Sequence, residues 1–321
     1  MTAMNSNSFE SSRRLRVFPL ALAVAFIWAC ASASALSAGT RQQTFDAPEG
    51  AVDALVAAAR VGGTAGLLKL LGPEGRKLVS SGDPVADKEG RDRFVAAYDT
   101  LNKIIRQGQD KAILVIGKDE WTLPIPIVKQ GKVWRFDTKA GEQQILERRV
   151  GRNELNAIEV CRAYVVAQRE YASQDRNDNG ILEYAQKFVS SSGRHDGLYW
   201  LANPGENESP MGPLVAAARA EGYSVPSKQG KRVPFHGYYY KILKRQGKDA
   251  PGGAYNYVAN GHMIGGFALV AFPAQYRVSG IMTFIVNQDG IVYQKDLGPD
   301  TLASASRMTA FNLDATWKNA P

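Results

Sequence analysis

The last third of the chain carries four short apolar runs, each rich in aromatic and β-branched residues and bounded by Gly, Pro, Asn or Asp. This composition is the sequence signature of β-strands. The last two runs are joined by Gln288-Asp289-Gly290, and Asp-Gly supplies the positive φ that a tight hairpin needs. The pattern predicts an antiparallel four-stranded meander over residues 237–243, 266–273, 280–287 and 291–295.

Helical and strand patterns follow one another in the residues before the meander. A long helix capped by Asn153 is predicted to run to about residue 173, because its apolar residues fall mostly on one broad face. Pro124 and Pro126 cannot donate to a ladder, so their strand should lie at an edge or be bulged. Helices are predicted over residues 48–61, 64–71, 84–107, 139–149, 181–189, 214–221 and 299–308, and strands over residues 111–116, 121–128 and 132–136.

Together these elements predict an α+β fold with two domains. Residues 41–150 should form N-terminal helices with a curved antiparallel hairpin sheet, and residues 151–321 a long helix packed on the four-stranded antiparallel meander. A chain of 321 residues is long enough for two domains of ordinary size. Its 45% hydrophobic residues and mean hydropathy of -0.25 are typical of a globular protein.

The first 35 residues have the pattern of a cleavable export signal. Arg13, Arg14 and Arg16 precede an apolar stretch over residues 17–28, which is too short to span a bilayer. Small residues follow, and cleavage after Ala33 or after Ala35 fits their spacing. We therefore expect an extracytoplasmic protein, periplasmic or secreted, without a transmembrane helix in the mature chain.

Two variants of export stay open. Ser12-Arg13-Arg14 is a twin-arginine candidate. Ile27-Trp28-Ala29-Cys30 resembles a lipoprotein cleavage box, although Trp before the small residue is unfavourable, so lipidation of Cys30 is the less favoured route. If Cys30 leaves with the signal, Cys161 is the remaining cysteine, and its apolar helical neighbours predict a buried, inert thiol.

Charge gives a weak indication of a partner. The formal net charge is +8, and loss of the signal removes three Arg and one Glu. One local excess of basic residues could meet an anionic polymer or a lipid head group, but a solvated loop and strand face is the favoured interpretation. We expect no nucleic acid partner, because the chain has no recognisable binding motif. The basic residues are Lys228, Lys231, Arg232, Lys241, Lys244, Arg245 and Lys248.

One stretch has the spacing of a calcium loop. Oxygen-bearing side chains occupy positions one, three and five, Gly180 follows, position seven offers a backbone carbonyl, and position nine carries a carboxylate. Position twelve is Gln186, where a bidentate Glu is usual, so the predicted Ca²⁺ site is weak and structural. The alternative is a polar turn that separates two helices. The predicted ligands are Asp175, Asn177, Asn179, Ile181 and Glu183.

Other catalytic or cofactor signals are scarce. His195, His236 and His262 are far apart, no pair has zinc-protease spacing, and no cysteine cluster occurs, so zinc is unsupported. The common serine-hydrolase, P-loop and dinucleotide patterns are also missing from the sequence. An acyl-transfer site would need His195 with Asp196, or His236, beside a serine such as Ser209 or Ser279. Aromatic side chains at Tyr199-Trp200 and Tyr238–Tyr240 suit either sugar stacking or core packing.

Three resemblances add to these predictions. Trp121-Thr-Leu-Pro-Ile-Pro126 and Val133-Trp-Arg-Phe-Asp137 make residues 45–137 look like the nuclear-transport-factor-2-like cone fold, which usually encloses a pocket. The C-terminal half resembles the globular domains of type IV pilins and pseudopilins, through Gly237-Tyr-Tyr-Tyr240, Gly265-Gly-Phe-Ala-Leu-Val-Ala271 and Thr283-Phe-Ile-Val-Asn-Gln-Asp-Gly290. Pilins join their apolar stem directly to the long helix, whereas here a whole domain intervenes, so this resemblance implies a fold and not filament assembly.

Nearly the whole mature chain is similar to the bacterial family filed as domain of unknown function 2950. The resemblance implies an exported bacterial protein and supplies no activity. It lies in Leu78-Val-Ser-Ser-Gly-Asp-Pro-Val85, Arg149-Val-Gly-Arg-Asn-Glu154, Gly197-Leu-Tyr-Trp200, His236-Gly-Tyr-Tyr239 and Val286-Asn-Gln-Asp-Gly-Ile-Val-Tyr-Gln-Lys-Asp-Leu-Gly-Pro299.

The leading functional expectation is an exported, non-enzymatic binding or scaffold protein of the bacterial envelope, stabilised by calcium and facing an envelope protein or an anionic or glycan polymer. It depends on two well-formed domains without a catalytic constellation. Two alternatives stay open: an envelope hydrolase that uses His236 or His195 with carboxylates on a cell-wall or polysaccharide substrate, and an accessory subunit of a pilin-related secretion system. The sequence leaves the oligomeric state open.

Overall fold

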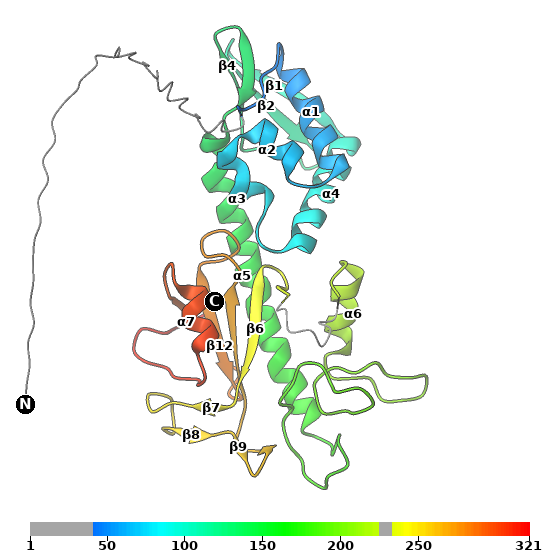
Figure 1. The fold of residues 1–321 in the computed structure, drawn as a ribbon, viewed down its shortest axis with the longest axis vertical. Coiled ribbons are helices and arrows are strands. Elements are labelled where there is room, and N and C mark those ends of the chain that lie inside the picture. The colour runs from blue at the N-terminus through cyan, green and yellow to red at the C-terminus, as the bar shows by residue number, and fades with distance from the viewer. Residues whose placement is uncertain (1–40, 225–232) are drawn as a thin grey trace, which may run out of the picture. The chain divides into compact units, whose positions relative to one another are not determined.

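The computed structural model describes residues 41–224 and 233–321. The predicted export signal, Cys30 and the basic residues Lys228, Lys231 and Arg232 therefore lie outside the described residues. The described residues belong to one compact unit of helices and antiparallel sheets, which confirms the α+β class (Figure 1). The division into domains at residue 150 stays a prediction.

The first part of the described chain packs short helices on an antiparallel sheet. The sheet has the order β1-β2-β4-β5, and β3 pairs with β2. The core between helices and sheet includes Val52, Leu70, Leu114, Ile127 and Phe136. The helices are α1 (Pro48–Val61), α2 (Ala65–Leu71), the 3₁₀ turn η1 (Pro73–Gly75), α3 (Arg76–Val79) and α4 (Pro84–Thr100), and the strands are β1 (Asn102–Gln107), β2 (Lys111–Ile116), β3 (Trp121–Thr122), β4 (Ile127–Gln130) and β5 (Val133–Phe136).

Two boundaries differ from the sequence prediction here. The helix predicted over residues 84–107 ends at Thr100, and residues 102–107 form β1, because β2 supplies an antiparallel partner for all six of them. The strand predicted over residues 121–128 is interrupted between β3 and β4. Pro124 and Pro126 fall in that interruption, as expected for residues that cannot donate to a ladder.

A single helix, α5 (Thr138–Tyr171), replaces the two helices predicted over residues 139–149 and 153–173. Asp137 caps its start by accepting from Ala140 N at 3.3 Å. Asn153 is not a cap: it lies inside the helix and its Nδ2 donates to Ser279 O at 2.9 Å. Gly151 is not among the residues with positive φ, so the helix passes through it without a break.

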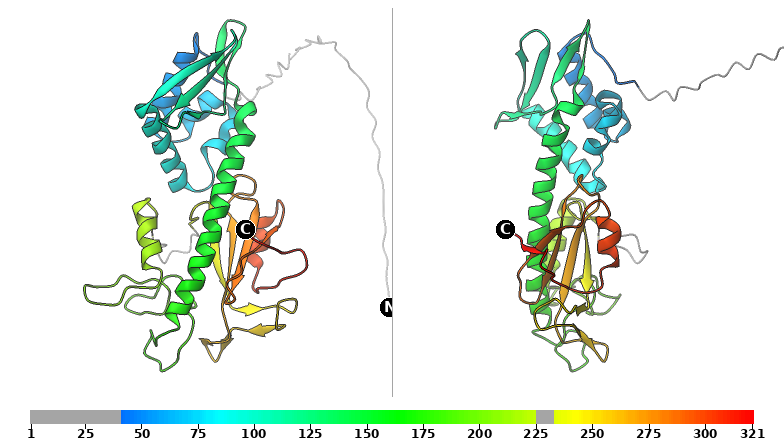
Figure 2. Two further views of the ribbon diagram at one scale, coloured as in Figure 1. Left: turned by 180° about the vertical axis from the view of Figure 1, so that it is seen from behind. Right: turned by 90° about the vertical axis from the view of Figure 1, so that its left-hand side faces the viewer.

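The predicted four-stranded meander is confirmed. β6 (Tyr238–Leu243), β11 (Ala268–Pro273), β12 (Met282–Asn287) and β13 (Tyr293–Asp296) pair in chain order, and β14 (Lys318–Asn319) extends the sheet beyond β13. Helices α5 and α7 (Thr301–Arg307) lie on opposite sides of the sheet (Figure 2). The other elements are α6 (Gly212–Ala220), β7 (Arg245–Gln246), β8 (Tyr255–Asn256), β9 (Val258–Ala259) and β10 (His262–Met263).

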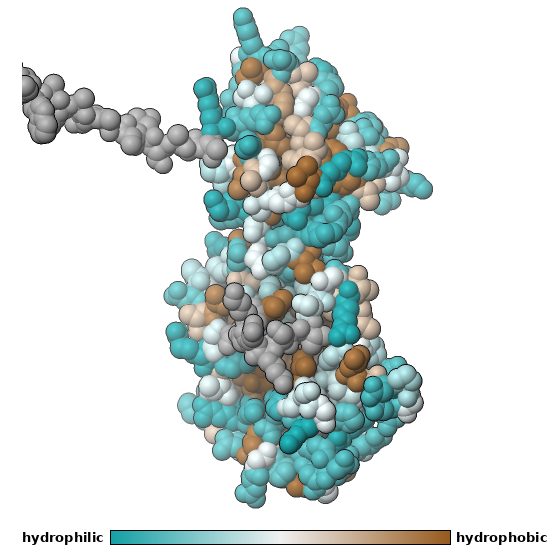
Figure 3. Space-filling view, turned by 45° about the vertical axis from the view of Figure 1, so that its right-hand side comes forward, coloured by the Kyte–Doolittle hydropathy of each residue, from teal (hydrophilic) through white to brown (hydrophobic). Residues whose placement is uncertain are grey.

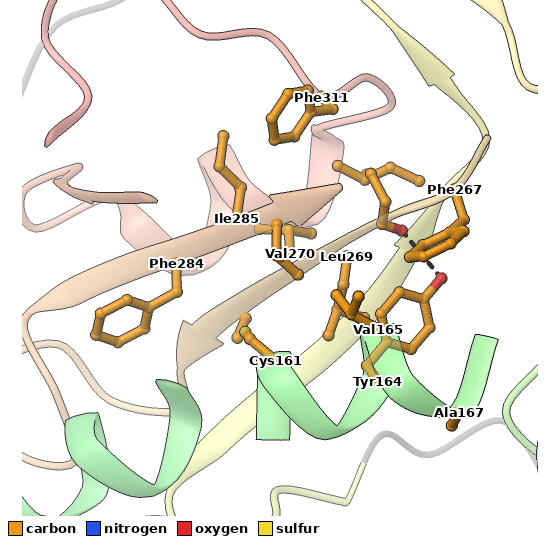
Figure 4. Close-up of a cluster of buried hydrophobic side chains, with 14 of the residues drawn as sticks. Cys161, Tyr164, Val165, Ala167, Phe267, Leu269, Val270, Phe284, Ile285 and Phe311 are labelled. Atoms are coloured by element: carbon orange, nitrogen blue, oxygen red, sulfur yellow. Dashed lines mark hydrogen bonds between the residues drawn. The ribbon is translucent and has the colours of Figure 1, made fainter. Parts of the chain in front are cut away.

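The core beneath α5 is apolar and closed. Cys161, Tyr164 and Val165 point from the helix toward β11 and β12, and Tyr164 donates its hydroxyl to Ala268 O at 3.3 Å (Figure 4). Burial raises the pKa of the Cys161 thiol to about 12. The prediction that this cysteine is buried is therefore confirmed, and its raised pKa disfavours the reactive thiolate.

The helix predicted over residues 181–189 is wrong, because the segment lies in an extended and irregular path. Its backbone groups find partners far away in the sequence: Tyr184 N donates to Met263 O, and Lys187 O accepts from Leu198 N. These partners replace the local hydrogen bonds that a helix would need.

The surface carries no broad apolar region on the face turned to the viewer in Figure 3, where hydrophilic side chains surround separate apolar patches. Within residues 41–224 and 233–321, no helix has both the length and the apolar character of a membrane span.

Candidate functional site

The predicted calcium loop lies in the wall of a polar cleft of about 660 Å³. Three segments that are distant in sequence meet there: the loop and the strand-like residues after it, residues 193–196, and the turn at residues 261–262. Both acidic and basic side chains line the cleft, so it suits a polar or charged ligand.

The first half of the loop is held by Asp175. Its two carboxylate oxygens accept from Asn179 N at 3.2 Å and from Gly180 N at 2.7 Å. The hydrogen bond from Gly180 N is the main reason that the pKa of Asp175 lies below its usual value. Gly180 has a φ of 77°, so the chain makes the sharp turn for which the sixth position of a calcium loop needs glycine.

The second half of the loop converges on Glu183, which is 7% exposed. Its Oε1 accepts from Asn177 Nδ2 at 2.9 Å and Asn179 Nδ2 at 2.7 Å, and lies 3.1 Å from His262 Nδ1. Its Oε2 accepts from Met263 N at 3.3 Å. Burial by itself would raise the pKa of Glu183, but these hydrogen bonds outweigh it and hold the pKa below the usual value.

The side-chain atoms in these contacts can be compared with the oxygen ligands of a calcium site. Asn177, Asn179 and Glu183 already meet, but the amides present nitrogen and not oxygen to the carboxylate. Asn177 Oδ1 is buried without a hydrogen-bond partner. Rotating the Asn177 amide by half a turn would present its unpartnered oxygen in place of the N–H donor, and oxygen is the donor type that Ca²⁺ prefers. The same rotation of the Asn179 amide would also release the oxygen that accepts from Ile181 N.

The remaining predicted positions fit less completely. Asp175 is bonded to the backbone of its own loop, and for Ile181 the structure gives a bond only through its N–H, which donates to Asn179 Oδ1 at 2.9 Å. Gln186 takes no part, since its amide bonds Gly261 O and Lys244 Nζ. No group of three His, Cys, Asp or Glu side chains in the described parts of the chain is placed to hold a metal. A calcium ion here would depend on amide and carbonyl oxygens, and its binding would be weak.

Two of the three histidines share the cleft. His262 contacts Glu183, and His195 stacks on Trp200 with ring centroids 4.4 Å apart. His236 does not line this cleft, and its Nε2 lies 3.3 Å from Glu221 Oε2. The three histidines therefore do not converge on one site.

The serine pairings considered for acyl transfer do not form among the described residues. Ser209 is buried at 4% exposure. Ser279 Oγ accepts from Gln275 N at 2.9 Å and donates to Gln275 O at 3.2 Å, so it is fully engaged with a neighbouring turn. No hydrogen bond between a histidine and either serine is found in the described chain.

The aromatic residues considered for sugar stacking are mostly buried, and the basic residue Lys241 is hydrogen-bonded within the protein. Tyr199, Trp200 and Tyr238 are at most 8% exposed, which favours core packing over sugar stacking. Lys241 Nζ donates to Ser306 O and Met308 O at 2.8 and 2.6 Å. Tyr238–Tyr240 thus support the sheet more than they offer a ligand platform.

Sequence reasoning missed several residues of the cleft. His262 follows Glu183 by 79 positions, and no local pattern links them. Lys187 Nζ lies 2.6 Å from Asp196 Oδ2, and this ion pair holds residues 187 and 196 together at the rim. The Arg176 side chain is 8% exposed and contacts the Trp200 ring at 5.8 Å. Only tertiary contacts show that these groups surround the loop.

Comparisons with known proteins locate the chain in one family. A family model described as "Protein of unknown function (DUF2950)" matches residues 42–320. No curated protein matches the chain, and no solved structure matches it.

Proposed function

Because the chain belongs to the DUF2950 family, whose description assigns no activity, we propose from its own residues that it is an exported, non-enzymatic binding or scaffold protein of the bacterial envelope whose 175–183 loop takes Ca²⁺. The family match covers the five stretches on which the resemblance was predicted. Calcium is plentiful outside the cytoplasm, so a weak site is useful there and nowhere else in the cell.

One observation carries the calcium proposal: Asn177, Asn179 and Glu183 converge beside the turn held by Asp175. The carboxylate of Glu183 also reaches Met263 N in β10. A cation at this point would connect the loop to β10 and hold the wall of the polar cleft. Its role would be structural: the ion orders the cleft that faces the partner.

Isothermal titration of Ca²⁺ into the mature chain tests the proposal. We expect one site with a dissociation constant of about 10⁻⁴–10⁻³ M, the range of extracellular calcium modules. At calcium about tenfold above that constant, binding should add about 1.4 kcal/mol to the free energy of unfolding. Asp175→Ala and Glu183→Gln should each abolish the heat of binding.

Asp178→Asn is the matched control. It removes one negative charge from the same loop at a position that is not a predicted ligand, and Asn tolerates its φ of 53°. This variant should bind calcium as the wild type does. No heat at millimolar calcium, or an equal loss in all three variants, would end the calcium proposal and leave a polar turn.

Export is tested separately by the mass of the mature protein. Expression of the full chain in a bacterial host should yield a periplasmic or secreted product that begins at Ser34 or Leu36. A product retained in the cytoplasm with residues 1–35 intact would contradict export. A mass increase consistent with a diacylglycerol on Cys30 would instead indicate the lipoprotein route.

A second candidate, an accessory subunit of a pilin-related secretion system, is favoured by the packing of α5 on the β6-β11-β12-β13 meander. It predicts that the protein co-purifies with membrane partners from its native envelope. Recovery of the protein free of such partners, after cross-linking, would remove this candidate.

A further inference from the structure

A second cleft, of about 670 Å³, lies along helices α4 and α5 and is lined by five arginines. Three acidic residues, Asp87, Glu89 and Glu221, also line it. Because the cleft has more arginines than acidic residues, some arginines have no acidic partner. The ion pairs that do form show which arginines are available to a ligand.

Two of the arginines are engaged by the protein itself. Arg93 forms an ion pair with Glu89 one turn earlier on α4. Arg149 donates to the carbonyls of Lys77 and Leu78, with Nη1 2.7 Å from Lys77 O. These two arginines therefore hold the walls of the cleft.

The acidic residues are engaged as well. Both carboxylate oxygens of Asp87 accept from Ser81 N, at 3.1 and 3.0 Å. Glu221 Oε2 lies 3.3 Å from His236 Nε2, and it accepts no hydrogen bond from the described residues. No carboxylate of the cleft lining is thus paired with a further arginine.

Arg91 on α4 and Arg148 and Arg152 on α5 complete the set. In the parts of the chain that the structure describes, none of the three takes part in an ion pair or hydrogen bond. Arg148 and Arg152 are exposed, and Arg91 is half-buried. Three unpaired guanidinium groups from two helices therefore face one cleft.

Without a ligand, these arginine side chains repel one another. Arg148 and Arg152 are four residues apart on one helix, and like charges at that spacing destabilise a helix. The pKa of Arg152 is lowered, first by partial desolvation and then by the charge of Arg93. Bound oxyanions would offset the repulsion between these positive charges, and guanidinium groups bind phosphate and carboxylate in bidentate geometry.

Apolar side chains line the same cleft. Phe94 and Ile145 line the cleft, and Trp121 lines it while 38% exposed. An exposed aromatic side chain beside cationic groups is suited to a ring or sugar that carries acidic substituents.

We propose that this cleft binds a ligand carrying two or more phosphate or carboxylate groups, held by Arg91, Arg148 and Arg152 and stacked against Trp121. The site is separate from the calcium loop, so it stands or falls independently of the function proposed above. It assigns an anionic partner to α4 and α5, whereas the sequence had suggested the basic residues of 228–248.

Calorimetric titration of the calcium-free mature chain at low salt tests the site with two probes, tripolyphosphate and trigalacturonate. We expect saturable binding of at least one probe that weakens as salt rises. Binding of tripolyphosphate alone indicates a phosphate-bearing ligand, and preference for trigalacturonate indicates a uronic acid ligand. The double variant Arg148→Gln/Arg152→Gln should bind about tenfold or more weakly. Trp121→Ala should weaken trigalacturonate more than tripolyphosphate.

Arg162→Gln is the matched control on the same helix, since Arg162 donates to Pro321 O and does not line the cleft. It should bind both probes as the wild type does. Thermal unfolding separates binding from structure: the double variant should keep or slightly raise the melting temperature of the free protein and lose the rise that the probe causes. Absence of saturable binding of both probes, or equal binding by the double variant, would overturn the proposal.

Discussion

Asp83 and Glu183 are both buried carboxylates with four hydrogen-bond partners, but the partners of Asp83 are mostly backbone groups and those of Glu183 are mostly side chains. Asp83 Oδ1 accepts from Val85 N and Ala86 N at the start of α4, and its Oδ2 accepts from Tyr223 OH and Gly237 N, both at 2.9 Å. Glu183 accepts mostly from side chains that can rotate, those of Asn177, Asn179 and His262.

The kind of donor explains the difference. Three of the four donors to Asp83 are backbone N–H groups, whose positions are set by α4 and by the residue before β6, so this carboxylate joins segments 140 to 154 residues apart. The amides around Glu183 can instead turn their oxygens inward and admit a cation. A carboxylate held by backbone is therefore structural, and one held by side chains can become a ligand site.

The largest expected effect is at Asp83. Asp83→Ala would leave three backbone N–H groups and the Tyr223 hydroxyl without their acceptor, in a place where water does not reach. We expect the free energy of unfolding to fall by about 3–5 kcal/mol. Urea denaturation of the mature chain measures it.

Asp137→Ala is the control for the cap alone, because Asp137 caps α5 through one backbone N–H and is only half-buried. It should cost about 1 kcal/mol. If both substitutions cost the same, the tertiary bonds of Asp83 to Tyr223 and Gly237 add nothing, and the comparison with Glu183 fails.

A smaller loss of stability should distinguish an arginine bonded to the protein, Arg149, from one available to a ligand, Arg152. Arg149→Gln removes donors to the carbonyls of Lys77 and Leu78, so it should lower the free energy of unfolding by about 1–2 kcal/mol. Arg152→Gln should change it by less than about 0.5 kcal/mol, since no such bonds are lost. Equal costs in urea denaturation would show that Arg152 has a structural role.

The smallest effect is the pH dependence of Glu183. Its pKa is lower in the folded protein than its usual value, so its contribution to stability is present above that usual value and is lost as the pH falls through the folded pKa. Without calcium, the wild type should therefore lose more stability than Glu183→Gln as the pH falls from about 5 to about 3, by on the order of 1 kcal/mol. The two urea midpoints plotted against pH measure this, and parallel curves would refute it.

Much of the fold follows from local pattern. The strands at residues 238–243, 268–273 and 282–287 follow from their aromatic and β-branched composition, and Gly290, with a φ of 83°, turns the chain after β12 as predicted. Two segments were mispredicted: residues 102–107 pair with the strand that follows them, and residues 181–189 take partners that are distant in sequence, such as Met263 O. Local periodicity carries no information about such partners.

The sequence by itself determined the family, the C-terminal strands and the spacing of Asp175, Asn177, Asn179 and Glu183, because each depends on neighbours along the chain. Tertiary structure alone decided that Glu183 meets His262, and that Arg91 shares a cleft with Arg148 and Arg152. These groups are brought together by the packing of separate helices and strands, and packing depends on the whole chain at once.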